Sequence, residues 1–232
     1  MIPKIIHQTW KNREVPDAWK DSPRSWKCLH PGWEYMFWTD EDISRFVEDK
    51  YPWFFPTFCS YPYNIQRVDA VRYLILYEFG GIYSDLDIIC IRRLEPLLCH
   101  EVAIPATKPY GYSNDLMLAE PGHPFFLQTI YSLEKAHRHF STHKFLPRHF
   151  RIMLSTGSLY LTRQHQIFPH KEKVFIIPGQ LYSGSPETSF VRHTVGNSWH
   201  GWDSRLLGLV HESGWIVLLL GVLFLCAVYL LM

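Results

Sequence analysis

A helix, a glycine pair and an acidic strand follow one another in the first half of the sequence and constrain the fold most strongly. From Ile65 to Phe79 the apolar side chains recur at spacings of three and four, which predicts one buried helical face. Gly80 and Gly81 end this helix, because glycine adopts the left-handed conformation that helix C-caps need. The following segment, Ile82 to Ile91, reads as a strand interrupted by two acids.

The order of strand and helix also occurs earlier in the chain. Ile2 to Trp10 reads as a short buried strand that leads into a loop, and Tyr35 to Trp38 as a second strand. With Thr39 or Asp40 as N-cap, a helix is expected from about Glu41 to Lys50. Repeated strand and helix predict an α/β fold. Weaker patterns predict helices near Phe125 to Phe140 and Arg151 to Thr162, and a strand at Val174 to Pro178.

Asp85 and Asp87 stand two residues apart in the apolar segment after the glycine pair. In an extended backbone residues i and i+2 face the same side, so both carboxylates can address one cation. Oxygen ligands suit Mg²⁺ or Mn²⁺, and such a cation offsets the charge that develops on a departing diphosphate. A solvated acidic turn is the alternative. Two carboxylates among apolar neighbours are costly to bury without a counter-charge, so we expect a bound cation or a basic partner.

Two further polar groups have more than one interpretation. Asp69 and Arg72 lie three apart on one helical face, which fits an exposed ion pair. It equally fits a site in which Asp69 binds a sugar hydroxyl and Arg72 binds a phosphate or the acidic pair. His193, Asn197 and His200 stand in a loop-like stretch and either complete a metal shell, contact phosphates or are surface residues.

The end of the chain is strongly apolar, since Trp215 to Met232 contains neither a charged residue nor a proline. These 18 residues span about 27 Å as a helix, so we expect a transmembrane helix there. The expected organisation is a catalytic domain over residues 1–205, a linker over 206–214 and a membrane helix over 215–232. No signal peptide is expected, and the side of the membrane that the domain faces stays open.

Charge and cysteine content argue against two classes of protein. The 23 Lys and Arg residues balance 22 Asp and Glu residues, so nucleic acid is not an expected partner. The five cysteines have no C-x-x-C spacing, so neither a zinc site nor a disulfide framework is predicted. Cys90 and Cys99 are either paired or free.

Seven motifs occur in order between Ile2 and about Asp203. They are I-P-K-I-I-H-Q-T-W, W-T-D, R-x-D-x-x-R-Y-x-x-L ending in G-G-I-Y-x-D-L-D, S-N-D-x-M, H-P-F-F, S-T-G and S-W-H. Together they resemble the D-x-D sugar transferases, and within these the catalytic subunits of inositol phosphoceramide mannosyltransferases. An ordered series of this kind is far more specific than a lone D-x-D.

The resemblance implies a GT-A type nucleotide-sugar-binding fold, which is a Rossmann-like mixed sheet flanked by helices. It implies transfer of mannose from GDP-mannose to the inositol headgroup of a sphingolipid, with retention at the anomeric carbon and Mn²⁺ or Mg²⁺ as the metal. The implied partners are a nucleotide sugar, a membrane lipid acceptor and the bilayer, with a regulatory membrane subunit as a further candidate. The implied location is the Golgi or another endomembrane, with a single membrane pass.

The resemblance also assigns roles by position. Asp85 and Asp87 match the metal motif, and Asn114 and Asp115 stand where the sugar and the acceptor meet. The residues implied to bind the nucleotide sugar are Trp10, beside the base, with Asp69, Arg72, Tyr83, Asp85 and Trp199.

Two other functions stay open at this point. One is a transferase of the same family with another sugar donor or a glycan acceptor. The other is a catalytically inactive, lectin-like or scaffolding subunit that regulates an active partner. The presence of both acids with Asp69, Arg72 and Asn114 argues against an inactive subunit, because a scaffold has no need of a cation site.

Overall fold

The computed structural model describes residues 1–107, 110–143 and 146–194, and a mixed six-stranded sheet runs through this part of the chain. The strand order is β2-β1-β3-β6-β5-β7. The strands are β1 (Ile5–Thr9), β2 (Glu34–Trp38), β3 (Gly81–Ser84), β5 (Val102–Pro105), β6 (Leu116–Ala119) and β7 (Val174–Ile177). A separate antiparallel pair consists of β4 (Ile88–Cys90) and β8 (Val191–His193).

The three strands β1, β2 and β3 are parallel, whereas β6 runs antiparallel to both of its neighbours. In the register of the first pair, Thr9 lies opposite Trp38. Because the carboxyl ends of parallel strands meet at one edge of a sheet, the residues that follow β1, β2 and β3 lie near one another. This edge carries the candidate site.

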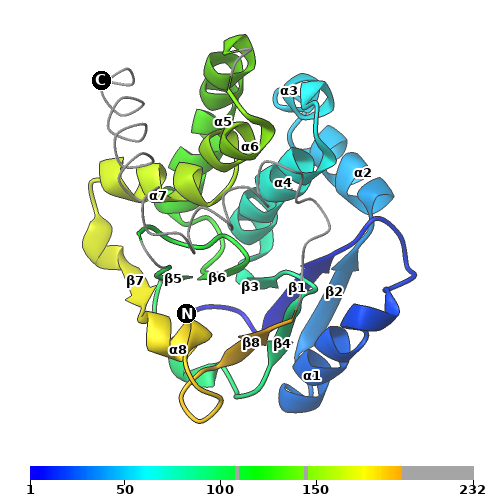
Figure 1. Cartoon of the computed structure of the whole chain (residues 1–232), viewed down its shortest axis with the longest axis vertical. Helices are drawn as coiled ribbons and strands as arrows, with labels where there is room; N and C mark the ends of the chain where they lie inside the picture. The colour runs from blue at the N-terminus through cyan, green and yellow to red at the C-terminus, as the bar shows by residue number, and fades with distance from the viewer. Residues whose placement is uncertain (108–109, 144–145, 195–232) are drawn as a thin grey trace, which may run out of the picture.

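Helices and the small strand pair cover the two faces of the sheet (Figure 1). The helices α2 to α7 lie on one face, and α1, α8 and the β4-β8 pair lie on the other. The helices are α1 (Asp21–Leu29), α2 (Asp40–Lys50), α3 (Phe55–Ser60), α4 (Asn64–Phe79), α5 (Pro124–Thr142), α6 (Arg148–Ser155), α7 (Ser158–Ile167) and α8 (Gly179–Ser183).

Two apolar cores result from this layering. The larger core joins α4 to α2, α3, α5 and α7, and includes Phe54, Leu74 and Phe125. The smaller core lies on the opposite face, where Trp26 and Ile82 pack. Alternate side chains of a strand point to opposite faces, so β6, which contributes to both cores, is apolar throughout.

Most of the predicted elements are confirmed, and two are corrected. The segment from 82 to 91 is not one strand, because β3 ends at Ser84 and β4 begins at Ile88 in a different sheet. The helix expected from Arg151 to Thr162 is two helices, since α6 ends at Ser155 and α7 begins at Ser158. The strands β1, β2 and β7 and the helices α2, α4 and α5 confirm their predictions. Cys90 and Cys99 are free thiols.

The predicted membrane helix over Trp215 to Met232, and the linker before it, lie outside the described residues. Within residues 1–107, 110–143 and 146–194, no helix has the length and apolar character needed to cross a bilayer.

The glycine pair between α4 and β3 brings the chain very close to β1. Gly81 has a φ of +87°, and a Cβ placed there would lie 2.5 Å from the carbonyl oxygen of Ile5. His7 secures the same turn, because its Nε2–H donates to the Gly80 carbonyl at 2.9 Å while its Nδ1 accepts from the Trp38 indole at 3.3 Å. Burial lowers the pKa of His7 to about 4, so the ring is neutral, as both contacts require.

We expect Gly81→Ala to destabilise the protein more than Gly32→Ala. Both glycines have positive φ, but a Cβ at Gly32 meets nothing within 4 Å. Gly32→Ala therefore reports the backbone conformation alone, about 1–2 kcal/mol. Gly81→Ala adds a steric clash worth about 1–3 kcal/mol more. The free energy of unfolding in urea measures both, and equal losses would show that β1 yields to the added methyl group.

Candidate active site

Asp85 and Asp87 lie in a turn between β3 and β4. The Ile88 N–H donates to the Asp85 carbonyl at 3.2 Å, and the Asp85 N–H donates to the Asp115 carbonyl at 2.8 Å. The extended backbone assumed from the sequence is therefore wrong. Both acids nevertheless line one pocket, because the turn that follows β3 directs them to the carboxyl edge of the sheet.

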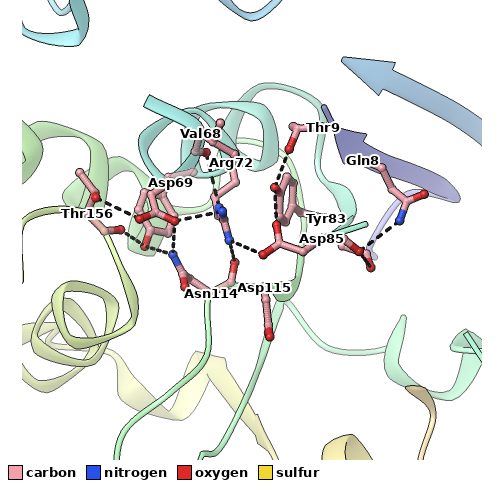
Figure 2. Close-up of polar contacts among 12 residues, drawn as sticks. Gln8, Thr9, Val68, Asp69, Arg72, Tyr83, Asp85, Asn114, Asp115 and Thr156 are labelled. Atoms are coloured by element: carbon pink, nitrogen blue, oxygen red, sulfur yellow. Dashed lines mark hydrogen bonds and ion pairs between the residues drawn. The ribbon is translucent and has the colours of Figure 1, made fainter. Parts of the chain in front are cut away.

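Arg72 joins helix α4 to this turn through three polar contacts (Figure 2). Its guanidinium lies 2.9 Å from Asp69 and 3.4 Å from Asp85, and it donates to the Asn114 carbonyl at 2.6 Å. Arg72 is 1% exposed and Asp69 is 4% exposed. The exposed ion pair that the sequence left open is therefore wrong, and the pair belongs to a buried polar network.

Tyr83 supports Asp85 from the side of β1. Its hydroxyl donates to Asp85 Oδ1 at 2.7 Å and accepts from the Thr9 hydroxyl at 2.9 Å. The Arg72 guanidinium stacks over the Tyr83 ring at 4.7 Å. Tyr83 is fully buried, so the structure places it behind Asp85, where it fixes the direction of that carboxylate.

Asp69 holds a second part of the site together. Asn114 Nδ2 donates to Asp69 Oδ1 at 3.0 Å, and the Thr156 hydroxyl donates to Oδ2 at 3.1 Å. Asn114 Nδ2 also lies 3.4 Å from the Tyr73 hydroxyl. These contacts fix the loop before β6 against the start of α7, and so set the position of Asp115.

The Asp115 carboxylate is held by α8. The Tyr182 hydroxyl lies 2.6 Å and 2.5 Å from the two carboxylate oxygens, so its single proton is shared between them. His193 packs edge-on against Tyr182 and places Nδ1 3.8 Å from Asp115 Oδ2. Asp115 therefore lies beside the acidic turn with a fixed orientation.

The site holds more carboxylates than the Arg72 charge can balance. Burial raises the pKa of Asp87, and the nearby charges of Asp85 and Asp115 add to the shift, which brings the pKa to about 7. Burial also raises the pKa of Asp85, although Arg72 opposes the shift. The pKa of Asp69 is raised to about 6, again by burial against the effect of Arg72. An added cation would favour the ionised form of these carboxyls.

The acidic turn fits part of the shell of a hard divalent cation. One oxygen of Asp85 accepts from Tyr83 and the other faces Arg72, which leaves lone pairs on both. Asp87 adds a second oxygen donor, and oxygen donors suit Mn²⁺ or Mg²⁺. Among the described residues, however, no three His, Cys, Asp or Glu side chains are grouped to hold a metal ion. The turn therefore supplies part of a shell.

Of the predicted metal ligands His193, Asn197 and His200, the structure describes His193. His193 ends β8 and faces Tyr182 and Asp115. The next residue, Thr194, contacts the acidic turn directly, with its N–H 2.7 Å and its hydroxyl 2.9 Å from the Asp87 carbonyl oxygen. Asn197, Trp199 and His200 lie outside the described residues.

A pocket of about 390 Å³ opens at the carboxyl edge of β1, β2 and β3. Asp85, Asp87 and Arg72 line it together with Trp10. Trp10 is half-buried and meets Trp19 edge-on, with 5.0 Å between ring centroids. The structure thus brings the predicted base-stacking residue Trp10 and the predicted metal residues Asp85 and Asp87 to one cavity.

Sequence reasoning missed some of the residues that shape this site. Tyr182 had no signal, because nothing in its neighbourhood indicates a contact with Asp115. Thr156 belongs to the S-T-G motif, but the sequence does not show that it contacts Asp69. Asp40 belongs to the W-T-D motif, but the sequence does not show that it lines the pocket. Each of these contacts joins segments that are distant in sequence.

Comparisons with known proteins identify the family of the chain. A sequence profile described as "glycosyltransferase sugar-binding region containing DXD motif" matches residues 16–104. The chain is 41% identical to inositol phosphoceramide mannosyltransferase 1 of Schizosaccharomyces pombe, over 97% of this chain and 72% of that protein. It is 42% identical to mannosyl phosphorylinositol ceramide synthase SUR1 of Saccharomyces cerevisiae, over 89% of this chain and 54% of that protein.

A solved structure shares the fold. The PaToxG glycosyltransferase has a TM-score of 0.51 and 17% sequence identity, and the match covers 72% of this chain and 70% of that one. At this identity the likeness shows the fold alone. Together with the mixed α/β sheet, it confirms the GT-A type fold expected for the described residues.

We expect Asp87→Asn to raise the stability of the metal-free protein at pH 8. The folded-state pKa of about 7 lies above the ordinary value of 3.8, so ionisation of Asp87 favours unfolding. The resulting loss of folding stability is fully present above about pH 7, and it decreases as the pH falls towards the ordinary pKa of 3.8. Asparagine keeps the shape of the side chain without its charge.

Thermal melts in EDTA at pH 8 and pH 5 measure this effect. The melting temperature should rise by a few degrees at pH 8, since about 1 kcal/mol moves it by about 2–4 °C in a domain of this size, and the gain should shrink at pH 5. Asp17→Asn, at an exposed acid paired with Lys20, serves as the control and should give no gain. A lower melting temperature for Asp87→Asn at pH 8 would show that the carboxylate is structural.

Proposed function

The chain belongs to the family of glycosyltransferases with a DXD sugar-binding region, and on that premise we propose that it is a retaining, metal-dependent mannosyltransferase. Its proposed donor is GDP-mannose, and its proposed acceptor is the inositol headgroup of a sphingolipid. The observation that carries the proposal is one pocket with the acidic turn at one part of its wall and Trp10 at another. The relatives that match 89–97% of this chain are named for mannose and for inositol phosphoceramide, which supports the sugar and the lipid.

We propose that Asp85 and Asp87 hold Mn²⁺ beside the donor diphosphate. When bound, such a cation neutralises charge on the departing phosphate oxygens. The chain's own task is to keep Asp85 ionised and correctly aimed, which Arg72 and Tyr83 do from opposite sides. Thr194 contacts the Asp87 carbonyl, so β8 ends beside the turn. His193, Asn197 and His200 stay proposed ligands, the last two outside the described residues.

Asp115 is proposed to orient the acceptor, with Asn114 beside it. Because both oxygens of Asp115 accept from the Tyr182 hydroxyl, its nucleophilic strength is reduced. This supports a front-side route over a covalent glycosyl intermediate, which would need a free carboxylate nucleophile. In the front-side route the leaving diphosphate oxygen takes the acceptor proton, and the sugar keeps its anomeric configuration.

Transfer assays test the proposed function. Membranes that contain the protein, inositol phosphoceramide and Mn²⁺ should incorporate label from radiolabelled GDP-mannose into the lipid, and not from UDP-glucose or UDP-galactose. EDTA and Asp87→Asn should each abolish incorporation, because both remove the charge balance at the diphosphate. Asp17→Asn should retain full activity. NMR of the product should show the anomeric configuration of the donor.

Each alternative gives a different result in the same assay. Incorporation from another nucleotide sugar, or into a glycan, would identify a different transferase of the family. Neither transfer nor hydrolysis of any donor would indicate a regulatory subunit. Activity that survives EDTA would remove the metal from the proposal, and an inverted product would remove the retaining mechanism.

The apolar segment from Trp215 to Met232 is proposed to anchor the enzyme to the bilayer that holds its acceptor. We expect a chain that ends at Arg205 to stay in the supernatant after a carbonate wash, and the full chain to sediment with membranes. The shortened chain should keep its rate on a soluble inositol acceptor and lose efficiency on the lipid. If it still sediments with membranes, the anchor lies elsewhere.

A further inference from the structure

We propose that Asp40 determines the base specificity of the pocket, and that its carboxylate recognises the two adjacent N–H donors of guanine. The proposal rests on the proposed function in one respect, namely that a nucleotide sugar binds with its base against Trp10. It goes beyond that function because it assigns the choice of base to a single side chain.

The sheet places Asp40 beside Trp10. β1 and β2 are parallel with Thr9 opposite Trp38, so Trp10 follows one strand end and Asp40 follows the other. The Trp10 N–H donates to the Trp38 carbonyl at 2.9 Å, and the Asp40 N–H lies 3.4 Å from the Lys11 carbonyl oxygen. Trp10 and Asp40 both line the pocket. A base that stacks on Trp10 would therefore turn one edge towards Asp40.

The other two acids in the first turn of α2 have different partners. Asp42 closes a capping box with Thr39, and it also pairs with Arg13 at 2.8 Å. Glu41 is exposed and pairs with Arg45 one turn along the helix. Because Thr39 and Asp42 complete the N-cap, the Asp40 carboxylate is not needed for it. Asp40 is the acid of this turn that lines the pocket.

The Asp40 carboxylate is oriented and has acceptor capacity left. Asn64 Nδ2 donates to Oδ2 at 3.2 Å. In the part of the chain that the structure describes, Oδ1 has no hydrogen-bond partner. An ionised carboxylate only accepts hydrogen bonds and has about four lone-pair sites. Both oxygens can therefore accept from a ligand, which is the geometry of a bidentate contact.

Only guanine among the common bases offers a matching edge. Its N1–H and its N2 amino group are adjacent donors, so each meets one carboxylate oxygen. Uracil has a single N–H between two carbonyls, and cytosine and adenine each set an amino group beside a ring nitrogen that accepts. With these bases an acceptor of the base would face an acceptor of Asp40, and such repulsion discriminates as effectively as attraction.

A structural role for Asp40 makes a different prediction. An acid at the first position of a helix interacts favourably with the helix dipole. If that were its whole role, replacing Asp40 would change stability and leave the order of nucleotide affinities unaltered. Glu41→Gln removes the same unit of charge one residue further along, on an exposed side chain. It is therefore the matched control for the charge at this helix end.

The wild-type protein allows a test that needs no variant. Titration calorimetry with Mn²⁺ compares GDP, inosine diphosphate and UDP. Inosine diphosphate lacks only the N2 amino group, so it should bind about tenfold or more weakly than GDP, since a hydrogen bond to a charged group is lost. UDP should also bind more weakly than GDP. Equal affinity for GDP and inosine diphosphate, or a preference for UDP, would overturn the proposal.

Asp40→Asn should exchange the preferred base. An asparagine amide can accept from N1–H and donate to the C2 carbonyl of xanthine, whereas it opposes the N2 amino group of guanine. We expect GDP to lose about tenfold or more in affinity and xanthosine diphosphate to gain, so that the order of the two reverses. Glu41→Gln should keep the wild-type order. Equal losses for both nucleotides in Asp40→Asn would indicate a structural role and overturn the proposal.

These measurements separate this proposal from the proposed function. Selective GDP binding without transfer of mannose to the lipid would refute the function and keep the base assignment. Transfer of mannose from GDP-mannose by an enzyme that binds GDP and inosine diphosphate equally would refute the base assignment and keep the function. Thermal melts of Asp40→Asn and Glu41→Gln confirm that each titrated variant is folded.

Discussion

The buried charge of Arg72 is the constraint on which the rest of the site depends. A guanidinium removed from water is costly unless it is paired and hydrogen-bonded, and Arg72 is 1% exposed. It has Asp69 from its own helix, Asp85 from the turn after β3, and the Asn114 carbonyl from the loop before β6. Helix α4, the turn after β3 and the loop before β6 are therefore held where each supplies a partner to the Arg72 guanidinium. Loss of any partner would leave a buried charge or dipole without its counterpart, so the network is all-or-none in energetic terms.

Further contacts of the turn come from β1, β3 and α1 and make it rigid. Thr9 and Tyr83 fix one oxygen of Asp85, while Gln8 Nε2 approaches the Asp85 carbonyl at 3.3 Å. Gln8 is itself held by the Ser22 hydroxyl at 2.9 Å, and Ser22 donates to the Ile88 carbonyl at 2.6 Å, just beyond the acids. A site for a cation needs first-shell side chains whose directions are set before the ligand arrives, because reorganisation would otherwise reduce affinity. The polar residues of β1 thus have a functional reason to be buried in an otherwise apolar sheet.

Much of the fold could be predicted from local pattern, whereas the site could be predicted only in outline. The periodicity of α4 and the strand-like runs of β1, β2 and β7 depend on neighbours in sequence, and these predictions are confirmed. The sequence predicts one strand for the acidic segment because apolar residues flank both acids. In the structure these flanks belong to two different sheets, one on each side of the turn. The contact of Tyr182 with Asp115 spans 67 residues, and that of Thr156 with Asp69 spans 87, so no local pattern signals either one. The burial of Asp69 and Arg72 could not be predicted for a similar reason. Their spacing shows that the two residues share a helical face, but it does not show what covers that face.

The acidic turn shows a conflict between stability and function, because the carboxylates that suit a cation site also lower the stability of the fold. Asp85, Asp87 and Asp115 repel one another, and burial adds to the cost of keeping them ionised. A fold selected for stability alone would place neutral side chains here. The surrounding network compensates, because Arg72, Tyr83 and Tyr182 stabilise two of the three carboxylates, while Asp87 receives no side-chain donor from the described residues. Any cation that binds the folded turn and not the unfolded chain adds its binding free energy to the stability of the protein. Asp87 is therefore the carboxylate through which occupancy of the site and stability of the fold are most directly coupled.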